Sequence, residues 1–85
     1  MSTHEKLLIR FLSIPVDFKY TELKTLLSGF GYVETNKGKS SGSRVAFINT
    51  DTGGIIRLHK PHPKPVLKRY QVKEIIAHLE ERGVI

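Results

Sequence analysis

The side chains best suited to chemistry on a phosphodiester lie between residues 37 and 73. Histidine exchanges protons near neutral pH, which makes His59 and His62 candidates for moving a proton. Arginine holds two phosphate oxygens with its planar guanidinium group, which makes Arg44 the candidate for stabilising negative charge. We predict these three as the catalytic residues. The alternative is that both histidines are ordinary loop or strand-edge residues.

The positive charge of the chain is concentrated in the same part, which we call the basic segment (residues 37–73). The chain has 85 residues and a net charge of +6. The basic segment alone carries +8, because its only acid is Asp51. Such asymmetry is typical of proteins that bind a nucleic-acid backbone. The alternative is a basic surface that maintains solubility. The nine cations are Lys37, Lys39, Arg44, Arg57, Lys60, Lys64, Lys68, Arg69 and Lys73.

A small polar stretch, NKGKSSGS (36–43), precedes Arg44. Its glycines allow the backbone to approach an anion, and its hydroxyl and amide groups can donate hydrogen bonds to phosphate oxygens. We therefore predict that Lys37, Lys39 and Ser43 bind backbone phosphates of a nucleic acid, in a loop without the spacing of a nucleoside-triphosphate site. The alternative is a mobile hairpin loop.

Further cations lie on either side of the sequence KPHPKP (60–65). We predict that the same nucleic-acid backbone is bound by Arg57, Lys60, Lys64, Lys68, Arg69 and Lys73. Cations at a helix N-terminus oppose the helix dipole, so their presence before the last helix favours a role in binding. The alternative is a solvated helix end.

Other classes of site and location are disfavoured by the sequence. There is no cysteine, so disulfides and thiolate metal sites are excluded, and a cytoplasmic location is expected. His59 and His62 have no third ligand nearby and flank Lys60, so no metal or other cofactor is expected. We find no signal peptide, no apolar run of membrane-spanning length and no basic amphipathic helix that would favour an anionic membrane.

The periodicity of apolar residues predicts an α+β fold in one domain, residues 1–85. Four-residue spacing indicates helices, and alternation indicates strands. Thr21 is the predicted N-cap of the second helix, while His4 and His78 are predicted to be solvated. The order is α-α-β-β-β-α: helices at 4–13 and 20–29, strands at 32–36, 43–49 and 55–59, and a helix at 69–82.

The three strands are expected to form an antiparallel sheet with the helices packed on one face. The opposite face would then be polar and basic. If the second and third strands pair, Arg44 and His59 approach each other on that open face. Folding would thus gather the cations of the basic segment on one side of the sheet.

The sequence resembles the HicA family of bacterial toxins, whose fold is similar to the double-stranded-RNA-binding domain. The matching stretches are ELKTLLSGFGY (22–32), GSRVAF (42–47) and HPKPVLKRYQVKEIIAHL (62–79). The first helix is an addition to the smallest members of that family.

The resemblance implies a metal-independent endoribonuclease that acts on mRNA and is neutralised by a HicB-like antitoxin. His62 matches the His-Pro position of the family. The family histidine that usually follows Gly-Ser is replaced here by Arg44, so a proton-transfer role would fall to His59 or His62. A non-catalytic RNA-binding module of the same fold is the second interpretation.

Overall fold

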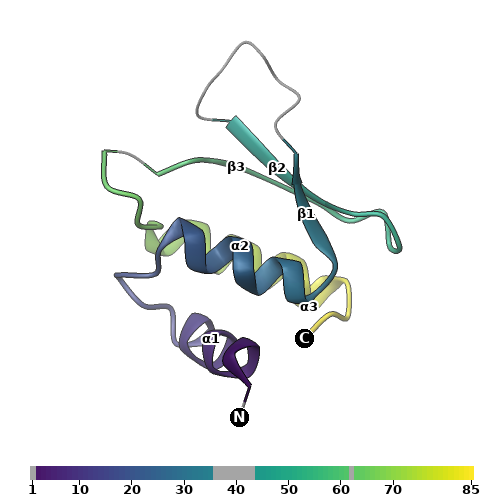
Figure 1. The fold of residues 1–85 in the computed structure, drawn as a ribbon, viewed down its shortest axis with the longest axis horizontal. Helices are drawn as coiled ribbons and strands as arrows, with labels where there is room; N and C mark the ends of the chain where they lie inside the picture. The colour runs from purple at the N-terminus through teal and green to yellow at the C-terminus, as the bar shows by residue number, and fades with distance from the viewer. Residues whose placement is uncertain (1, 36–43, 62) are drawn as a thin grey trace.

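The computed structural model describes residues 2–35, 44–61 and 63–85, and its elements follow the predicted order (Figure 1). The helix bounds differ from the predicted bounds by at most one residue at either end. The α+β fold predicted from periodicity is confirmed. The elements are α1 (Thr3–Leu12), α2 (Tyr20–Gly29), β1 (Tyr32–Thr35), β2 (Arg44–Asn49), β3 (Ile55–His59) and α3 (Arg69–Glu81).

The sheet has the order β1-β2-β3, and both neighbours run antiparallel to the central strand β2. Val45 and Phe47 of β2 and Ile56 of β3 are buried on the face that the helices cover. Because side chains alternate along a strand, Arg44, Ala46 and their neighbours in register lie on the opposite, open face.

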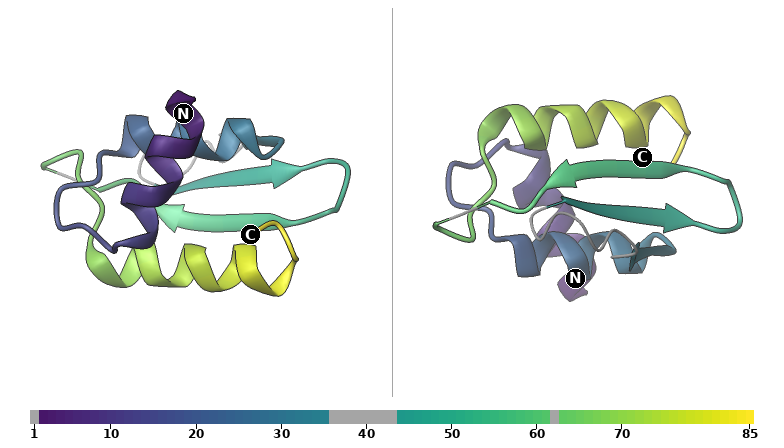
Figure 2. Two further views of the ribbon diagram at one scale, coloured as in Figure 1. Left: turned by 90° about the horizontal axis from the view of Figure 1, so that it is seen from below. Right: turned by 90° about the horizontal axis from the view of Figure 1, so that it is seen from above.

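The helices α2 and α3 form the layer beneath the sheet, and their apolar faces pack against it. α2 lies under the β1 side and α3 under the β3 side (Figure 2). Leu23 and Leu27 of α2 and Val72 and Leu79 of α3 are completely buried. Burial of such side chains contributes about 1.5–3 kcal/mol each relative to exposure, so this layer is the main source of stability.

The first helix packs differently from the prediction. α1 lies on the side of α2 and α3 that faces away from the sheet, so the molecule has a third layer (Figures 1 and 2). Phe11 of α1 is fully buried, and its ring centroid lies 4.9 Å from that of Phe18. The apolar stripe of α1 therefore packs on α2 and on the segment between α1 and α2, because α2 and α3 already fill the covered face of the sheet.

The helices begin with local hydrogen bonds, and a glycine with positive φ follows both α2 and α3. Thr21 is not the N-cap of α2: Lys19 is, and its backbone N–H donates to Glu22 Oε1 at 3.0 Å. α3 begins in the same way, with Lys68 N–H donating to Gln71 Oε1 at 3.0 Å. After α2, Gly31 has a φ of +90°, a conformation that favours glycine and turns the chain into β1.

The proline-rich connection between β3 and α3 is tied to the segment between α1 and α2. Leu67 N–H donates to the Phe18 carbonyl at 2.8 Å, and Tyr20 N–H donates to the Pro65 carbonyl at 2.9 Å. Lys19 and Val66 form an isolated antiparallel bridge. These bonds fix where the cations that precede α3 lie.

Candidate functional site

Arg44 and His59 are direct cross-strand neighbours in the β2–β3 ladder. Both side chains are exposed on the open face, and Arg57 lies two residue pairs further along, opposite Ala46 and on the same face. The three line a shallow hollow on this face together with Thr35. The predicted approach of Arg44 and His59 therefore occurs.

This arrangement can bind one phosphate group with charge and present an imidazole to it. Directly opposed residues in an antiparallel pair have Cβ atoms about 4.5–5.5 Å apart, so both side chains can reach the same ligand. Arg57 adds a second guanidinium group beside them. The geometry suits a ligand with several anionic oxygens.

The remainder of the open face is apolar, contrary to the polar and basic surface predicted. Val33, Ile48 and Ile55 form a row across the three strands, since Ile48 is paired with each of the other two. Val33 is 65% exposed and Ile55 is 39% exposed. Alternation predicted which face of the sheet these residues occupy. They are exposed because no helix or strand of the described residues covers that face.

Those other cations of the basic segment that the structure describes do not join Arg44 and Arg57. Lys64, Lys68 and Arg69 line a second hollow beside Val16, around the start of α3. Lys73 is exposed further along α3. The single cationic side predicted from the charge distribution is therefore divided into two. Four further candidate residues, Lys37, Lys39, Ser43 and His62, lie outside the residues that the structure describes.

Lys60 takes part in a polar network between β1 and α2. Its ammonium lies 5.5 Å from the centre of the Tyr20 ring. The Tyr20 hydroxyl donates to Glu34, and Lys24 Nζ lies 3.2 Å from the same carboxylate. The hydrogen bond from Tyr20 is the main cause that lowers the pKa of Glu34, and the charges of Lys24 and Lys60 act in the same direction. Lys60 thus has structural contacts at the β1 side of the molecule.

This network yields a prediction for stability. Tyr20→Phe should lower the free energy of unfolding at pH 7 by about 1.5–3 kcal/mol, because a hydrogen bond to a charged group is lost. Glu34 has a lowered pKa in the folded chain, so its contribution is present above its ordinary pKa of 4.5 and is lost as the pH falls below it. The effect of Tyr20→Phe should therefore shrink at pH 3. Urea unfolding at both pH values measures it.

The matched control for this prediction is Tyr70→Phe, because Tyr70 is 58% exposed and also carries a hydroxyl group. It should change stability by no more than about 0.5 kcal/mol. Equal losses for the two variants would contradict a specific role of the Tyr20–Glu34 bond.

The prediction that His4 and His78 are solvated is wrong. His4 Nε2 donates to the Leu26 carbonyl at 3.1 Å, and its ring lies 4.7 Å from the Phe30 ring. His78 Nε2 lies 2.9 Å from the Tyr32 hydroxyl. Both partners are distant in the sequence, so helix periodicity carries no signal for them.

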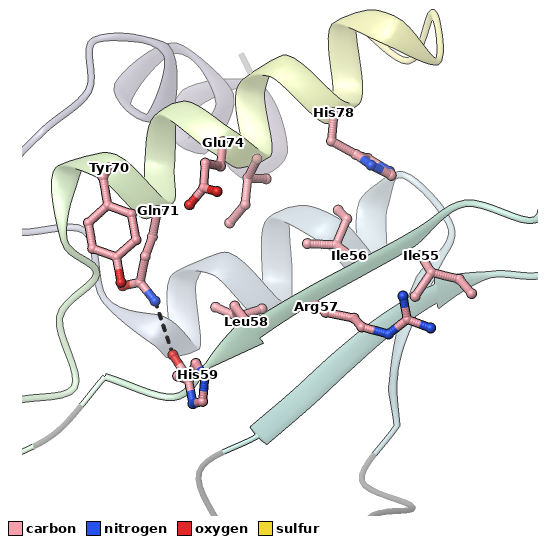
Figure 3. Close-up of a pocket in the computed structure, with 10 residues that line it drawn as sticks. Ile55, Ile56, Arg57, Leu58, His59, Tyr70, Gln71, Glu74 and His78 are labelled. Carbon is pink, nitrogen blue, oxygen red and sulfur yellow. Dashed lines mark hydrogen bonds between the residues drawn. The ribbon is translucent and has the colours of Figure 1, made fainter.

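His78, the partner of Tyr32, lines one end of a groove between β3 and α3 (Figure 3). Gly54 permits this contact, because a Cβ there would lie 2.8 Å from the Tyr32 hydroxyl oxygen. Burial, followed by the charge of Arg82, lowers the pKa of His78. A neutral imidazole suits a structural hydrogen bond between β1 and α3.

The described part of the chain has neither a metal-binding cluster nor a membrane-spanning helix. It contains no cluster of three or more histidine, cysteine, aspartate or glutamate side chains placed to hold a metal ion. None of its helices has the length and apolarity needed to span a bilayer.

Fold and site together define a small α+β protein with an arginine–histidine pair on the uncovered face of its sheet. Residues 20–81 match a family model described as the HicA toxin of bacterial toxin-antitoxin systems. The match covers most of the chain, and the protein therefore belongs to the HicA toxin family. Neither the search of curated proteins nor the search of solved structures finds a match. α1 lies outside the matched residues.

Proposed function

We propose that this protein is an endoribonuclease toxin that cleaves mRNA without a metal ion and is neutralised by a HicB-like antitoxin. Membership of the HicA toxin family supports the toxin role. The observation that carries the catalytic proposal is the pairing of Arg44 with His59 on an exposed face. We propose further that the protein acts in the cytoplasm as a single domain of residues 1–85.

In the proposed mechanism, Arg44 binds the scissile phosphate and stabilises the charge that develops on its oxygens. His59 takes the proton of the 2′-hydroxyl or supplies one to the leaving oxygen. His62 is the second candidate for proton transfer. Arg57, lying beside the pair, binds a phosphate oxygen.

The remaining cations have a positioning role in this proposal. Lys37, Lys39 and Ser43 bind phosphates next to the scissile one. Lys64, Lys68, Arg69 and Lys73 hold a more distant part of the RNA, and Lys60 adds charge near β1. Such contacts are sequence-independent and weaken with salt.

A second candidate function is RNA binding without cleavage. It is favoured by Arg44, which stands where the family usually has its histidine and which stays protonated at physiological pH. Arg44 can bind a phosphate but cannot transfer protons, so cleavage depends on another residue.

Induction in bacteria, with and without the neighbouring reading frame, separates the two functions. Growth arrest that the neighbour relieves, together with RNA cleavage by purified protein in EDTA, is the expected result. RNA binding without arrest or cleavage would instead establish the binding module. The His59→Ala variant, purified in parallel, controls for contaminating ribonuclease.

A further inference from the structure

The backbone of β3 presents hydrogen-bonding groups to the outer edge of the sheet. Asn49 N–H donates to the Gly54 carbonyl at 2.9 Å, which makes Asn49–Gly54 a hydrogen-bonded pair. Bonded and non-bonded pairs alternate in an antiparallel ladder, so Ile56 and Leu58 bond to β2. The backbone N–H and C=O groups of Ile55, Arg57 and His59 consequently point away from β2.

Among the described residues, one hydrogen bond from elsewhere in the protein reaches the outward backbone groups of β3. Gln71 Nε2 donates to the His59 carbonyl at 3.1 Å. Within the described ranges, no strand pairs with the outer edge of β3. Unpaired edge groups of this kind are a template for adding another strand.

A groove runs beside the edge, between β3 and α3 (Figure 3). Its floor includes the buried Ile56 and Ile75, and Tyr70, Glu74 and His78 of α3 line it as well. An added strand directs alternate side chains to opposite faces. One set would enter this groove, and the other set would extend the open face beside Ile55 and Arg57.

We propose that an extended segment of the antitoxin adds to β3 as a fourth strand, with an acidic residue opposite Arg57 and an apolar side chain in the groove. This inference rests on the proposed function for the identity of the partner. Charge complementarity supports it, because the open face carries Arg44 and Arg57 and the chain has a net charge of +6. The apolar side chains of the added strand would contact Ile56 and Ile75 in the groove.

A second copy of this chain is a poorer occupant of the same edge. Two-fold antiparallel pairing of β3 with itself, centred on Arg57, places the two arginines directly opposite each other. If the pairing register shifts by two residues, the two arginines lie diagonally across from each other, and their long side chains can still meet. Like charges so placed are destabilising.

Amide hydrogen exchange tests the proposal on the complete complex. The toxin is co-expressed with the product of the neighbouring reading frame, and residue-resolved exchange is compared with that of the free toxin. The amides of Ile55 and Arg57 should exchange at least ~10-fold more slowly in the complex, since they gain strand hydrogen bonds. Glu34 serves as the control, because its backbone faces the outer edge of β1, and its exchange rate should not change.

A pair of variants at one position provides the second measurement. Ile55→Pro removes an outward N–H at the first residue of β3, where proline is tolerated, whereas Ile55→Ala keeps it. Ile55→Pro should weaken the complex by about 3–10-fold more than Ile55→Ala, which corresponds to one lost hydrogen bond. Equal affinities for the two variants would overturn strand addition.

The outcomes separate this inference from the proposed function. A stable complex in which Ile55 and Arg57 stay unprotected overturns strand addition and leaves the toxin–antitoxin pairing intact. Failure of the neighbouring product to bind overturns both. Protection of these amides by RNA in place of the protein partner overturns the choice of occupant.

Discussion

Replacement of His59 by alanine should reduce RNA cleavage by about 10²–10⁴-fold, which is the usual contribution of one positioned proton-transfer group. RNA affinity should change by less than about twofold, because Arg44 and Arg57 supply the charge that binds phosphate. The side chain of His59 is exposed, so the variant should fold normally. Single-turnover cleavage and equilibrium binding of the same RNA measure the two effects.

Arg44→Ala gives a contrasting result in the same assays. The guanidinium group acts on the phosphate both in the bound substrate and in the transition state, so this variant should lose affinity as well as rate. Full turnover by a variant that lacks both His59 and His62 would exclude the proposed proton transfer. Loss of affinity alone in His59→Ala would support the RNA-binding module instead.

The sequence predicted the elements well because each has one strong apolar period. Leu23, Leu26 and Leu27 occur at helical spacing and are all buried in α2. In β2, alternation correctly separated the buried Val45 from the exposed Arg44. Periodicity indicates the direction of a side chain but not what packs on it. It therefore did not predict that α1 packs on α2 and not directly on the sheet.

The same reasoning explains which parts of the candidate site were predicted. The pairing of Arg44 with His59 follows from two adjacent strands and a short turn, so local pattern was sufficient. Lys60 lies over Tyr20, and His78 pairs with Tyr32, across distances in sequence that no local pattern reports. The division of the cations into two groups likewise depends on the path of the proline-rich connection.

The packing of α1 connects it to the proposed function. α1 lies outside the family match, yet it contributes the fully buried Phe11 and the cation Arg10. Arg10 Nη1 donates to Glu22 Oε2 of α2 at 2.9 Å, and its guanidinium carbon lies 5.0 Å from the centre of the Phe18 ring. α1 therefore holds α2 and the segment before it, which in turn hold the connection that carries Lys64 and Lys68.

Phe11→Ala should lower the free energy of unfolding by about 3–5 kcal/mol, the usual cost of truncating a buried phenylalanine. Its side chain is 0% exposed and packs on Phe18, so the truncation leaves a cavity between α1 and the rest of the core. A domain of this size has only about 4–13 kcal/mol of stability in total, so at least about a quarter of it would be lost. Chemical denaturation followed by circular dichroism measures the change.

Ile9→Ala is the matched control, since Ile9 lies on the same helix and is 54% exposed. It should cost no more than about 0.5–1 kcal/mol, because it opens no cavity and alanine favours the helix. If Phe11→Ala cost as little as Ile9→Ala, α1 would be a loosely attached addition and not part of the core. The large predicted difference thus decides whether α1 is needed to hold α2, and with it the connection before α3, in place.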